Sequence, residues 1–353
     1  MRFYNLLFCP VVAVLLLWGC RNKTEVVQFA GLEEPEKQKS YSTEIFNDDY
    51  LFSYPQQLIR YDSLLVVSDY FDRTEAFHLF STHDGHFLYS FGRKGRGPGE
   101  VISPGSISLD RRNGMVVWDG GQKKLLRYRM PLNAGDSVRY AGQLQNLRGA
   151  HFGDIFFAGE DCYVFGHVDP LRFGRLAGDS VGVLYSDYPL LTEDEEANRS
   201  VWNYEPHVCA TADGRHFAVS CYLGAALEIF SIDRDSIRSE KLLAIAPPIY
   251  RVVEGTRPKW VAAVDETIDG FLDLQASDRY IYALLCDSQA PYGARSIRVF
   301  DWEGNPVFRM NFDRVVQQIC VDEPDGIIYG TYEDAETGEY HLLKLRFDPN
   351  DWE

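Results

Sequence analysis

The sequence predicts an all-β protein, a six-bladed β-propeller of four-stranded antiparallel blades that is preceded by a lipoprotein signal peptide and a flexible tether. Three observations lead to this prediction. From Ile45 onward the chain consists of short runs rich in Val, Ile, Leu, Tyr and Phe, punctuated by Gly, Asp and Asn. A turn followed by an apolar strand recurs six times in this part. A second apolar strand follows each copy, and we find no amphipathic helix of ten or more residues.

The first twenty residues have the order of a signal peptide. Arg2 precedes an apolar stretch from Leu6 to Trp18, about 13 residues long. A helix that crosses the bilayer needs roughly 20 residues. The stretch ends in Leu-Trp-Gly-Cys, which resembles the lipobox of bacterial lipoproteins. The resemblance implies that residues 1–19 are removed and that Cys20 carries the lipid, so that a palmitate-type anchor tethers the protein to a membrane. The alternative is an ordinary secretory leader with an incidental cysteine.

Residues 20–44 connect this cysteine to the first apolar strand. They are mostly polar and charged, and they contain one proline, Pro35. Such a segment has little apolar surface to bury. It therefore predicts a flexible tether, with the folded domain spanning residues 45–350.

The first repeated strand lies in residues 62–69, 112–119, 159–166, 213–220, 277–284 and 324–331. Equivalent positions in the six copies are spaced by 51, 47, 55, 63 and 47 residues. The second lies in residues 77–81, 125–129, 182–186, 227–231, 297–301 and 342–346. A unit of about 50 residues accommodates the four strands of a propeller blade. We expect a strand from one terminus to complete the blade at the other terminus and so close the ring. Unrelated hairpins of a large β-sandwich are the alternative.

A glycine-rich basic segment follows the first unit, from Gly92 to Glu100. It contains the glycines Gly92, Gly95, Gly97 and Gly99, the proline Pro98 and the cations Arg93, Lys94 and Arg96. Glycine allows positive φ angles, so consecutive backbone N–H groups can form a concavity that binds an anion. An equally weighted alternative is a tight crossover between two blades, in which Glu100 neutralises an arginine.

The stretch from Phe91 to Glu100, behind a lipoprotein leader, resembles the six-bladed TolB-like β-propeller lipoproteins of Bacteroidetes. The resemblance implies a propeller over residues 45–350 and a location in the cell envelope. It brings no established catalytic residues. Arg21 and Lys23 follow Cys20 where surface-displayed lipoproteins of that phylum carry acidic residues, which favours the periplasmic side of the outer membrane over the cell surface.

The charge and the cysteines exclude several classes of protein. The net charge of −17 repels phosphate backbones, so nucleic acid is not an expected partner. Five widely spaced cysteines remain after Cys20, which argues against a disulfide framework. Cys209 and Cys221, on either side of one predicted turn, are the pair to test for a bridge. The acidic run from Glu193 to Glu196 is interpreted as a solvated loop.

Candidate binding residues come from loops that a propeller gathers at one end of its central channel. We expect Arg93, Arg96, His151, Tyr204 and His207 to line a polar pocket there, with Lys94 and Glu100 contributed by the glycine-rich segment. A pocket with cations and histidines suits a carboxylate or uronate ligand. The sequence contains no catalytic motif, metal-binding motif or cofactor-binding motif that we recognise. We therefore predict no catalytic residues, no metal and no cofactor.

The leading functional hypothesis is a membrane-anchored envelope lipoprotein that binds a protein or a glycan on the loop face of the propeller without catalysing a reaction. The alternative is a carbohydrate-active lyase or hydrolase with its polar site at the channel mouth. Three or more histidine or carboxylate groups within coordination distance in the channel would favour the enzyme. An apolar plug at the mouth would instead indicate a purely architectural protein.

Overall fold

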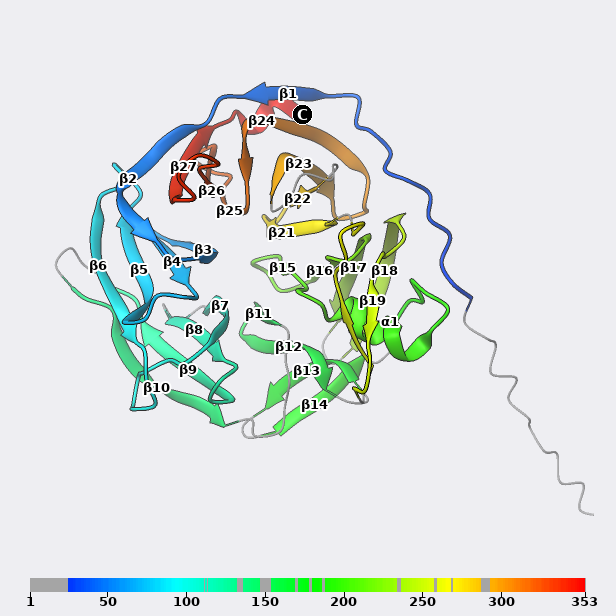
Figure 1. The fold of residues 1–353 in the computed structure, drawn as a ribbon, viewed down its shortest axis with the longest axis horizontal. Coiled ribbons are helices and arrows are strands. Elements are labelled where there is room, and N and C mark those ends of the chain that lie inside the picture. The colour runs from blue at the N-terminus through cyan, green and yellow to red at the C-terminus, as the bar shows by residue number, and fades with distance from the viewer. Residues whose placement is uncertain are drawn as a thin grey trace, which may run out of the picture.

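The computed structural model describes residues 25–110, 112, 114–131, 136–146, 154–168, 171–177, 180–185, 188–233, 236–256, 259–267, 269–286 and 293–352. Within these residues, six antiparallel sheets surround one axis (Figure 1). Each sheet forms a blade of four antiparallel strands. The prediction of a six-bladed propeller is confirmed. Cys20 and His151 lie outside the described residues.

Blades 1 to 3 follow the chain from the innermost to the outermost strand. Blade 1 contains β3 (Pro55–Tyr61), β4 (Leu64–Asp69), β5 (Glu75–Ser81) and β6 (Phe87–Arg93). Blade 2 contains β7 (Pro104–Asp110), β8 (Gly114–Asp119), β9 (Lys124–Arg129) and β10 (Arg139–Asn146). Blade 3 contains β11 (Asp154–Ala158), β12 (Asp161–Val168), β13 (Leu171–Ala177) and β14 (Ser180–Tyr185).

Blades 4 and 5 continue this order, and blade 6 takes its outermost strand from the other end of the chain. Blade 4 contains β15 (Val208–Ala210), β16 (His216–Cys221), β17 (Ala225–Asp233) and β18 (Ser236–Ala246). Blade 5 contains β21 (Phe271–Ala276), β22 (Tyr280–Leu285), β23 (Ala294–Asp301) and β24 (Pro306–Val316). Blade 6 contains β25 (Gln318–Asp322), β26 (Ile327–Glu333), β27 (Tyr340–Arg346) and β2 (Glu44–Phe52). The expected closure of the ring is thus confirmed, because β2 pairs antiparallel with β27.

The first repeated strand of the sequence is the second strand of every blade. The second repeated strand is the third strand of every blade except blade 3, where residues 182–186 overlap the outermost strand, β14. The third strand there is β13, which has the sequence LRFGRLA. Arg172 and Arg175 interrupt its apolar pattern, and this explains why the strand is not evident from the sequence.

Apolar side chains fill the spaces between neighbouring blades. Each pair of adjacent blades shares one buried cluster; between blades 1 and 2, for example, Phe77 and Tyr128 pack with their ring centroids 5.9 Å apart. The burial of large aromatic residues at each interface holds the blades as one ring. Cys209 and Cys221 are free, and each is buried in a different cluster, so the bridge considered from the sequence is not formed.

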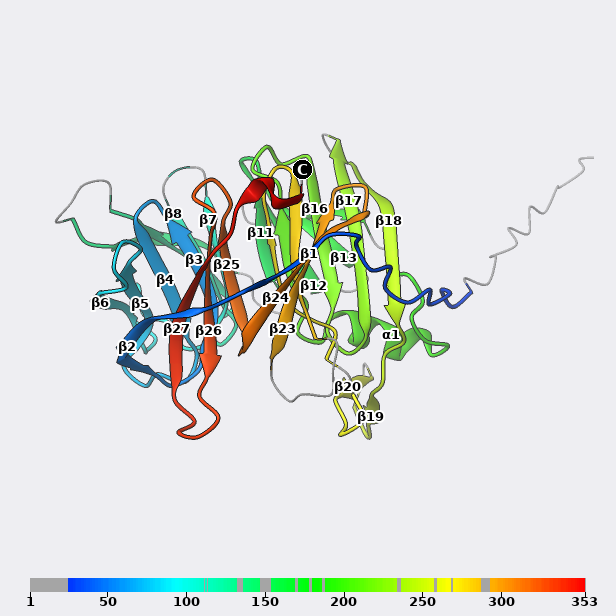
Figure 2. The same ribbon diagram turned by 90° about the horizontal axis from the view of Figure 1, so that it is seen from above.

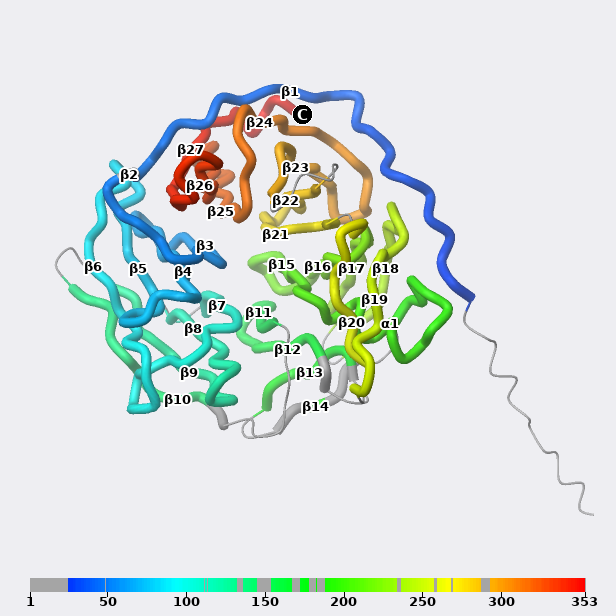
Figure 3. The backbone as a smooth tube through the Cα atoms, in the orientation of Figure 1, coloured from blue at the N-terminus to red at the C-terminus, as the bar shows by residue number. Residues whose placement is uncertain are grey.

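Residues 25–41, which we call the strap, run along the outer rims of blades 4 and 5 (Figures 1 and 3). The Val27 N–H donates to Leu190 O at 2.8 Å, and the Ala30 N–H donates to Ala244 O at 2.9 Å. Further along, β1 (Gln38–Tyr41) pairs parallel with β24 as a fifth strand. This segment therefore differs from the flexible tether that its polar composition predicts. Its few apolar residues pack on the blades, and backbone pairing needs no apolar side chains.

Two short elements lie in the longer connections. The helix α1 (Glu195–Trp202) precedes blade 4, and the hairpin of β19 (Arg251–Val253) and β20 (Trp260–Ala262) precedes blade 5. The acidic run is thus a helix start rather than the predicted solvated loop, because Asp194 caps the helix by accepting the N–H groups of Glu196 and Ala197. Acidic residues in the first turn favour this end of a helix. Among the described residues, no helix has the length and apolar character needed to cross a bilayer.

Candidate functional site

Four strands per blade return the chain to the face from which the blade began. Each connection from one blade to the next therefore lies on the same face, which we call the crossover face. It carries the segment between β6 and β7, the helix α1 and the β19–β20 hairpin, and the latter two lie on the lower side of the ring in Figure 2. The innermost strands begin on this face, so the side chains that precede them can meet at the axis.

The glycine-rich segment forms a compact crossover whose concavity is filled by its own glutamate. Gly92 and Gly99 have φ angles of 73° and 74°, as expected for glycine in tight turns. The Gly97 N–H donates to the Glu100 carboxylate at 2.7 Å. The Gln122 amide of blade 2 donates to Glu100 O at 2.9 Å. This arrangement supports the crossover interpretation over an open anion site.

The cations of this segment lie on the rim of blade 1. Arg93 ends β6, the outermost strand, opposite Glu75 in the register. The Lys94 ammonium donates to Tyr70 O at 3.1 Å, and burial lowers its pKa against the opposing effect of Asp69 and Asp72. Arg96 is exposed. Because β6 is farthest from the axis in its blade, the structure does not bring Arg93 into a pocket with His207.

A ring of polar residues surrounds the axis at equivalent positions of the six blades, in the innermost strand or, for His207, directly before it. Its members, the axial ring, are Gln57, Ser106, Asp154, His207, Asp273 and Gln318. Several of them accept a backbone N–H from the next blade. Gln57 accepts from Ile107 at 2.8 Å, Ser106 accepts from Ile155 at 3.1 Å, and Asp273 accepts from Ile319 at 2.9 Å. The ring therefore holds neighbouring innermost strands in register.

Three members of the axial ring titrate at unusual pH values. Burial raises the pKa of Asp154 to about 7 and that of Asp273 to about 7, although hydrogen bonds from backbone N–H groups act in the opposite direction. Burial lowers the pKa of His207 to about 4. His207 Nδ1 lies 3.8 Å from Asp273 Oδ1, and its side chain is 24% exposed. At neutral pH the imidazole is uncharged beside a partly protonated carboxyl group.

A second cluster lies at the crossover face where blades 4 and 5 begin. We call Tyr204, Glu205, Tyr222 and Asp269 the rim cluster. The Tyr222 hydroxyl hydrogen-bonds to Asp269, and the rings of Tyr204 and Tyr222 lie 5.8 Å apart. Burial, and then the charge of Asp269, raises the pKa of Glu205; burial also raises the pKa of Asp269. The pKa of each carboxyl group is therefore shifted upward from its ordinary value.

Tyr204 and His207 thus both lie just before β15 on the crossover face, and their neighbours are the acidic residues Glu205, Asp269 and Asp273. Sequence reasoning missed Glu205, Asp269 and every member of the axial ring except His207. One signal could have found the ring. In each unit a polar residue directly precedes Leu, Ile or Val at the start of the innermost strand, as in PQQL (55–58) and EPHV (205–208).

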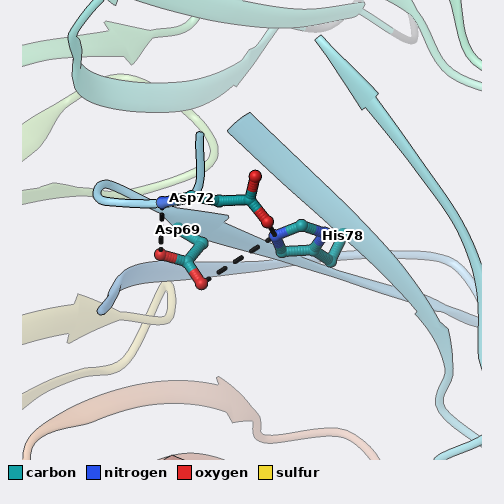
Figure 4. Close-up of side chains that lie close together, drawn as sticks. All are labelled: Asp69, Asp72 and His78. Atoms are coloured by element: carbon teal, nitrogen blue, oxygen red, sulfur yellow. Dashed lines mark hydrogen bonds and ion pairs between the residues drawn. The ribbon is translucent and has the colours of Figure 1, made fainter. Parts of the chain in front are cut away.

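A third cluster, Asp69, Asp72 and His78, lies in blade 1 (Figure 4). Each of the three offers one ligand atom, and these atoms lie within 4.8 Å of one another. Among the described residues, these three form the group of histidine and carboxylate side chains that could hold a metal ion. The sequence predicts no metal site, and nothing in its motifs singles out these three residues. They come from β4, from the following turn and from β5, so only the hairpin brings them together.

Six four-stranded blades, a ring closed by an N-terminal strand and a polar axis define a closed six-bladed β-propeller. The family model described as "TolB-like 6-blade propeller-like" matches residues 33–134 and 191–324. The chain belongs to this family, as the resemblance of the glycine-rich segment implies. No curated protein matches the sequence.

Solved structures support the same fold. A member of the duf4221 family from Bacteroides vulgatus is 10% identical, with a TM-score of 0.58, over 92% of this chain and 99% of that chain. The calcium-binding protein regucalcin from Agrobacterium tumefaciens is 11% identical, with a TM-score of 0.51, over 89% and 98%. An exported protein from Bacteroides fragilis, so described by its name, is 11% identical with a TM-score of 0.50, over 88% and 100%. At these identities the similarity shows the fold alone.

Proposed function

We propose that this chain is an extracytoplasmic binding protein that holds a glycan fragment on the crossover face, where the rim cluster meets the axis. The rim cluster carries the proposal. It joins two tyrosine rings, with their hydroxyl groups, to two carboxyl groups. Sugar hydroxyl groups need donors and acceptors together, and their ring faces pack on aromatic side chains. An amine-bearing sugar would also suit the acidic side chains.

The support under this cluster is rigid. Glu205 and Asp269 lie just before β15 and β21, whose strands are held at the axis by the ring. The Gly270 N–H donates to Tyr222 O at 2.6 Å, and this bond joins the start of blade 5 to the end of β16. A preformed site loses little conformational entropy when it binds a ligand. The net charge of −17 leaves nucleic acid an unlikely partner class, as argued from the sequence.

The proposal includes attachment to the outer membrane through a lipid on Cys20, with the domain on the periplasmic side. The leader and the Leu-Trp-Gly-Cys sequence support it. The name of the Bacteroides fragilis neighbour describes that protein as exported, which agrees with an envelope location. Mass spectrometry of the protein from its native envelope should find a diacylglyceryl group on Cys20. A Cys20→Ala variant that remains in the membrane fraction would contradict lipid anchoring.

The binding test uses an array of envelope glycans, followed by calorimetry of any hit. The double variant Glu205→Gln with Asp269→Asn should lower the affinity at least ten-fold, because each amide is uncharged and replaces one acceptor oxygen by an NH2 donor. Glu336→Gln, an exposed change in another loop of the crossover face, is the matched control. If only a protein co-purifies and no glycan binds, the site recognises a protein instead.

One observation favours a second candidate, a carbohydrate-active lyase or hydrolase. Glu205 and Asp269 interact electrostatically, and both have a raised pKa, which is a property of carboxyl groups that act as general acids. Incubation of a bound glycan with the protein distinguishes the two candidates. Products that disappear in Asp269→Asn while binding persists would establish the enzyme. A glycan recovered intact after prolonged incubation would leave the binding function.

A further inference from the structure

The carboxylates of Asp69 and Asp72 are fixed by backbone groups at the start of the hairpin between β4 and β5. Asp69 accepts the N–H groups of Ser53 at 2.6 Å and Tyr54 at 2.8 Å. Asp72 Oδ1 accepts the N–H groups of Thr74 at 2.7 Å and Glu75 at 3.0 Å. The Oδ2 atom of Asp72 is left directed toward His78 (Figure 4).

His78 is held so that its second ring nitrogen points at both carboxylates. Its side chain is 1% exposed, and its Nδ1 atom lies 2.8 Å from the hydroxyl groups of Tyr50 and Ser90. Tyr50 Oη is 3.5 Å from Nε2, so its close contact is with Nδ1. Nε2 lies 3.7 Å from Asp72 Oδ2 and 3.9 Å from Asp69 Oδ2. These distances are too long for hydrogen bonds. Two ligands of one tetrahedral zinc ion lie roughly 3.4 Å apart, close to this spacing.

Blade 2 shows what the architecture requires at these positions. Asp119 ends β8 as Asp69 ends β4, and it accepts the N–H groups of Ile102 at 2.8 Å and Ser103 at 3.2 Å. The position equivalent to His78 is Leu126, because each lies opposite the residue two before the aspartate. The third residue after Asp119 is Gln122, and its amide donates to Asp119 at 2.8 Å. To fix the crossover segment before the innermost strand, a blade therefore needs only the aspartate at the position of Asp69 and Asp119.

Blades 1 and 2 thus share the aspartate that accepts two backbone N–H groups, whereas Asp72 and His78 have no acidic or histidine counterpart in blade 2. The charged groups around them are the two carboxylates, Lys94 from the crossover segment and Glu75 at the end of the turn. Burial is the main cause that lowers the pKa of His78, and the charges of Asp69 and Asp72 oppose it. Lys94, bound to Tyr70 O, offsets only part of the negative charge.

We propose that Asp69, Asp72 and His78 form a site for a divalent transition-metal ion, with zinc as the best match. One imidazole nitrogen with two carboxylate oxygens suits zinc better than calcium, which prefers oxygen ligands alone. The hydroxyl groups at Nδ1 fix the ring orientation, as outer-shell partners do in metal sites. The Asp72 side chain is 21% exposed, which provides an entry path. This site is separate from the proposed glycan site, which lies on blades 4 and 5.

The test titrates zinc chloride into the full mature chain after dialysis against a chelator. We expect one zinc ion per chain and a higher melting temperature with zinc than without it. Asp72→Asn should weaken binding at least ten-fold, because the asparagine carbonyl keeps the backbone bonds made by Oδ1 but removes the ionised Oδ2. Asp194→Asn is the matched control, since Asp194 also caps two N–H groups through Oδ1, on the same face and without a histidine.

Two further measurements keep the outcome clear. His78→Leu introduces the residue that blade 2 has at this position, so it should fold and lose zinc. His207→Gln should bind one zinc ion as the wild type does, which places the ion on blade 1. The proposal is overturned if the wild type binds no zinc, if Asp72→Asn and His78→Leu both bind it unchanged, or if calcium binds in its place.

Discussion

The Glu100 side chain determines whether the glycine-rich segment can bind an external anion. Its carboxylate accepts the Gly97 N–H at 2.7 Å, so the concavity that the glycines form is occupied from within the chain. The sequence pattern alone is typical of an anion site and of a tight crossover. The partly buried Glu100 carboxylate, which accepts a backbone N–H from within the segment, distinguishes them, and that distinction depends on backbone geometry.

The two glycines nearest Glu100 should differ in their tolerance of a side chain. Gly99→Val should lower stability by about 1–3 kcal/mol, because its φ of 74° is unfavourable for valine and an added Cβ would lie 2.7 Å from the Tyr140 ring. Gly97→Val should cost less, since its closest contacts are with the flexible Glu100 side chain. Thermal melts of both variants check this. Equal melting temperatures would contradict the role given to the positive φ.

The basic residues of this segment should have little effect on the proposed glycan site. Arg93 lies at the end of the outermost strand of blade 1, far around the ring from blades 4 and 5. We expect Arg93→Ala with Arg96→Ala to fold normally and to change glycan affinity by less than two-fold. A large loss, measured by the same calorimetry, would return these cations to the binding site.

Asp273 should make stability depend on pH in a defined direction. Its folded pKa of about 7 is above the ordinary aspartate pKa of 3.8, so the folded state holds a proton that the unfolded state loses as the pH rises from about 4 to 7. Its contribution to stability therefore declines over this range. His207, with a pKa of about 4, contributes the opposite slope between about 4 and 6.5.

The measurement compares melting temperatures of the wild type and Asp273→Asn at several pH values. Asparagine does not titrate, so the variant should gain stability relative to the wild type as the pH rises from 4 to 7. The comparison cancels the His207 contribution to first order. A constant difference across the range would show that Asp273 is ionised in the folded protein throughout.

The strap is the main difference between expectation and structure at the element scale. Glu34 pairs with Arg298 at 2.9 Å and with Arg309 at 3.3 Å, and Tyr41 donates to Asp351 at 2.8 Å. The strap covers the open edge of β24, which would otherwise offer unpaired backbone groups. Its composition is polar because most of its bonds are made by backbone and charged groups.

Deletion of residues 25–41 should lower the melting temperature by several degrees and increase association between chains through the exposed β24 edge. Both effects follow from the loss of the parallel pairing between β1 and β24. Calorimetry and light scattering measure them. A truncated chain that melts and remains monomeric like the wild type would show that the segment acts only as a tether.

The whole fold was more predictable than the site. Six repeats require only that apolar strands recur, and residues such as Met115 and Phe217 show this directly. The axial ring and the rim cluster depend on side chains from neighbouring blades, such as His207 and Asp273, which are 66 positions apart in the sequence. The third strand of blade 3 was not predicted because arginine is usually a surface residue. Arg172 is instead fully buried and pairs with Glu228 at 2.6 Å.

The closure by β2 also sets the order in time in which this protein can be completed. Glu44 of β2 lies opposite Lys344 of β27. A strand near the N-terminus, which is synthesised early, can therefore pair only after a strand near the C-terminus has been synthesised. Contacts between such distant segments form slowly, and the ring cannot be finished while the chain is still being synthesised. The last blade therefore stays open until the C-terminal strands have been synthesised.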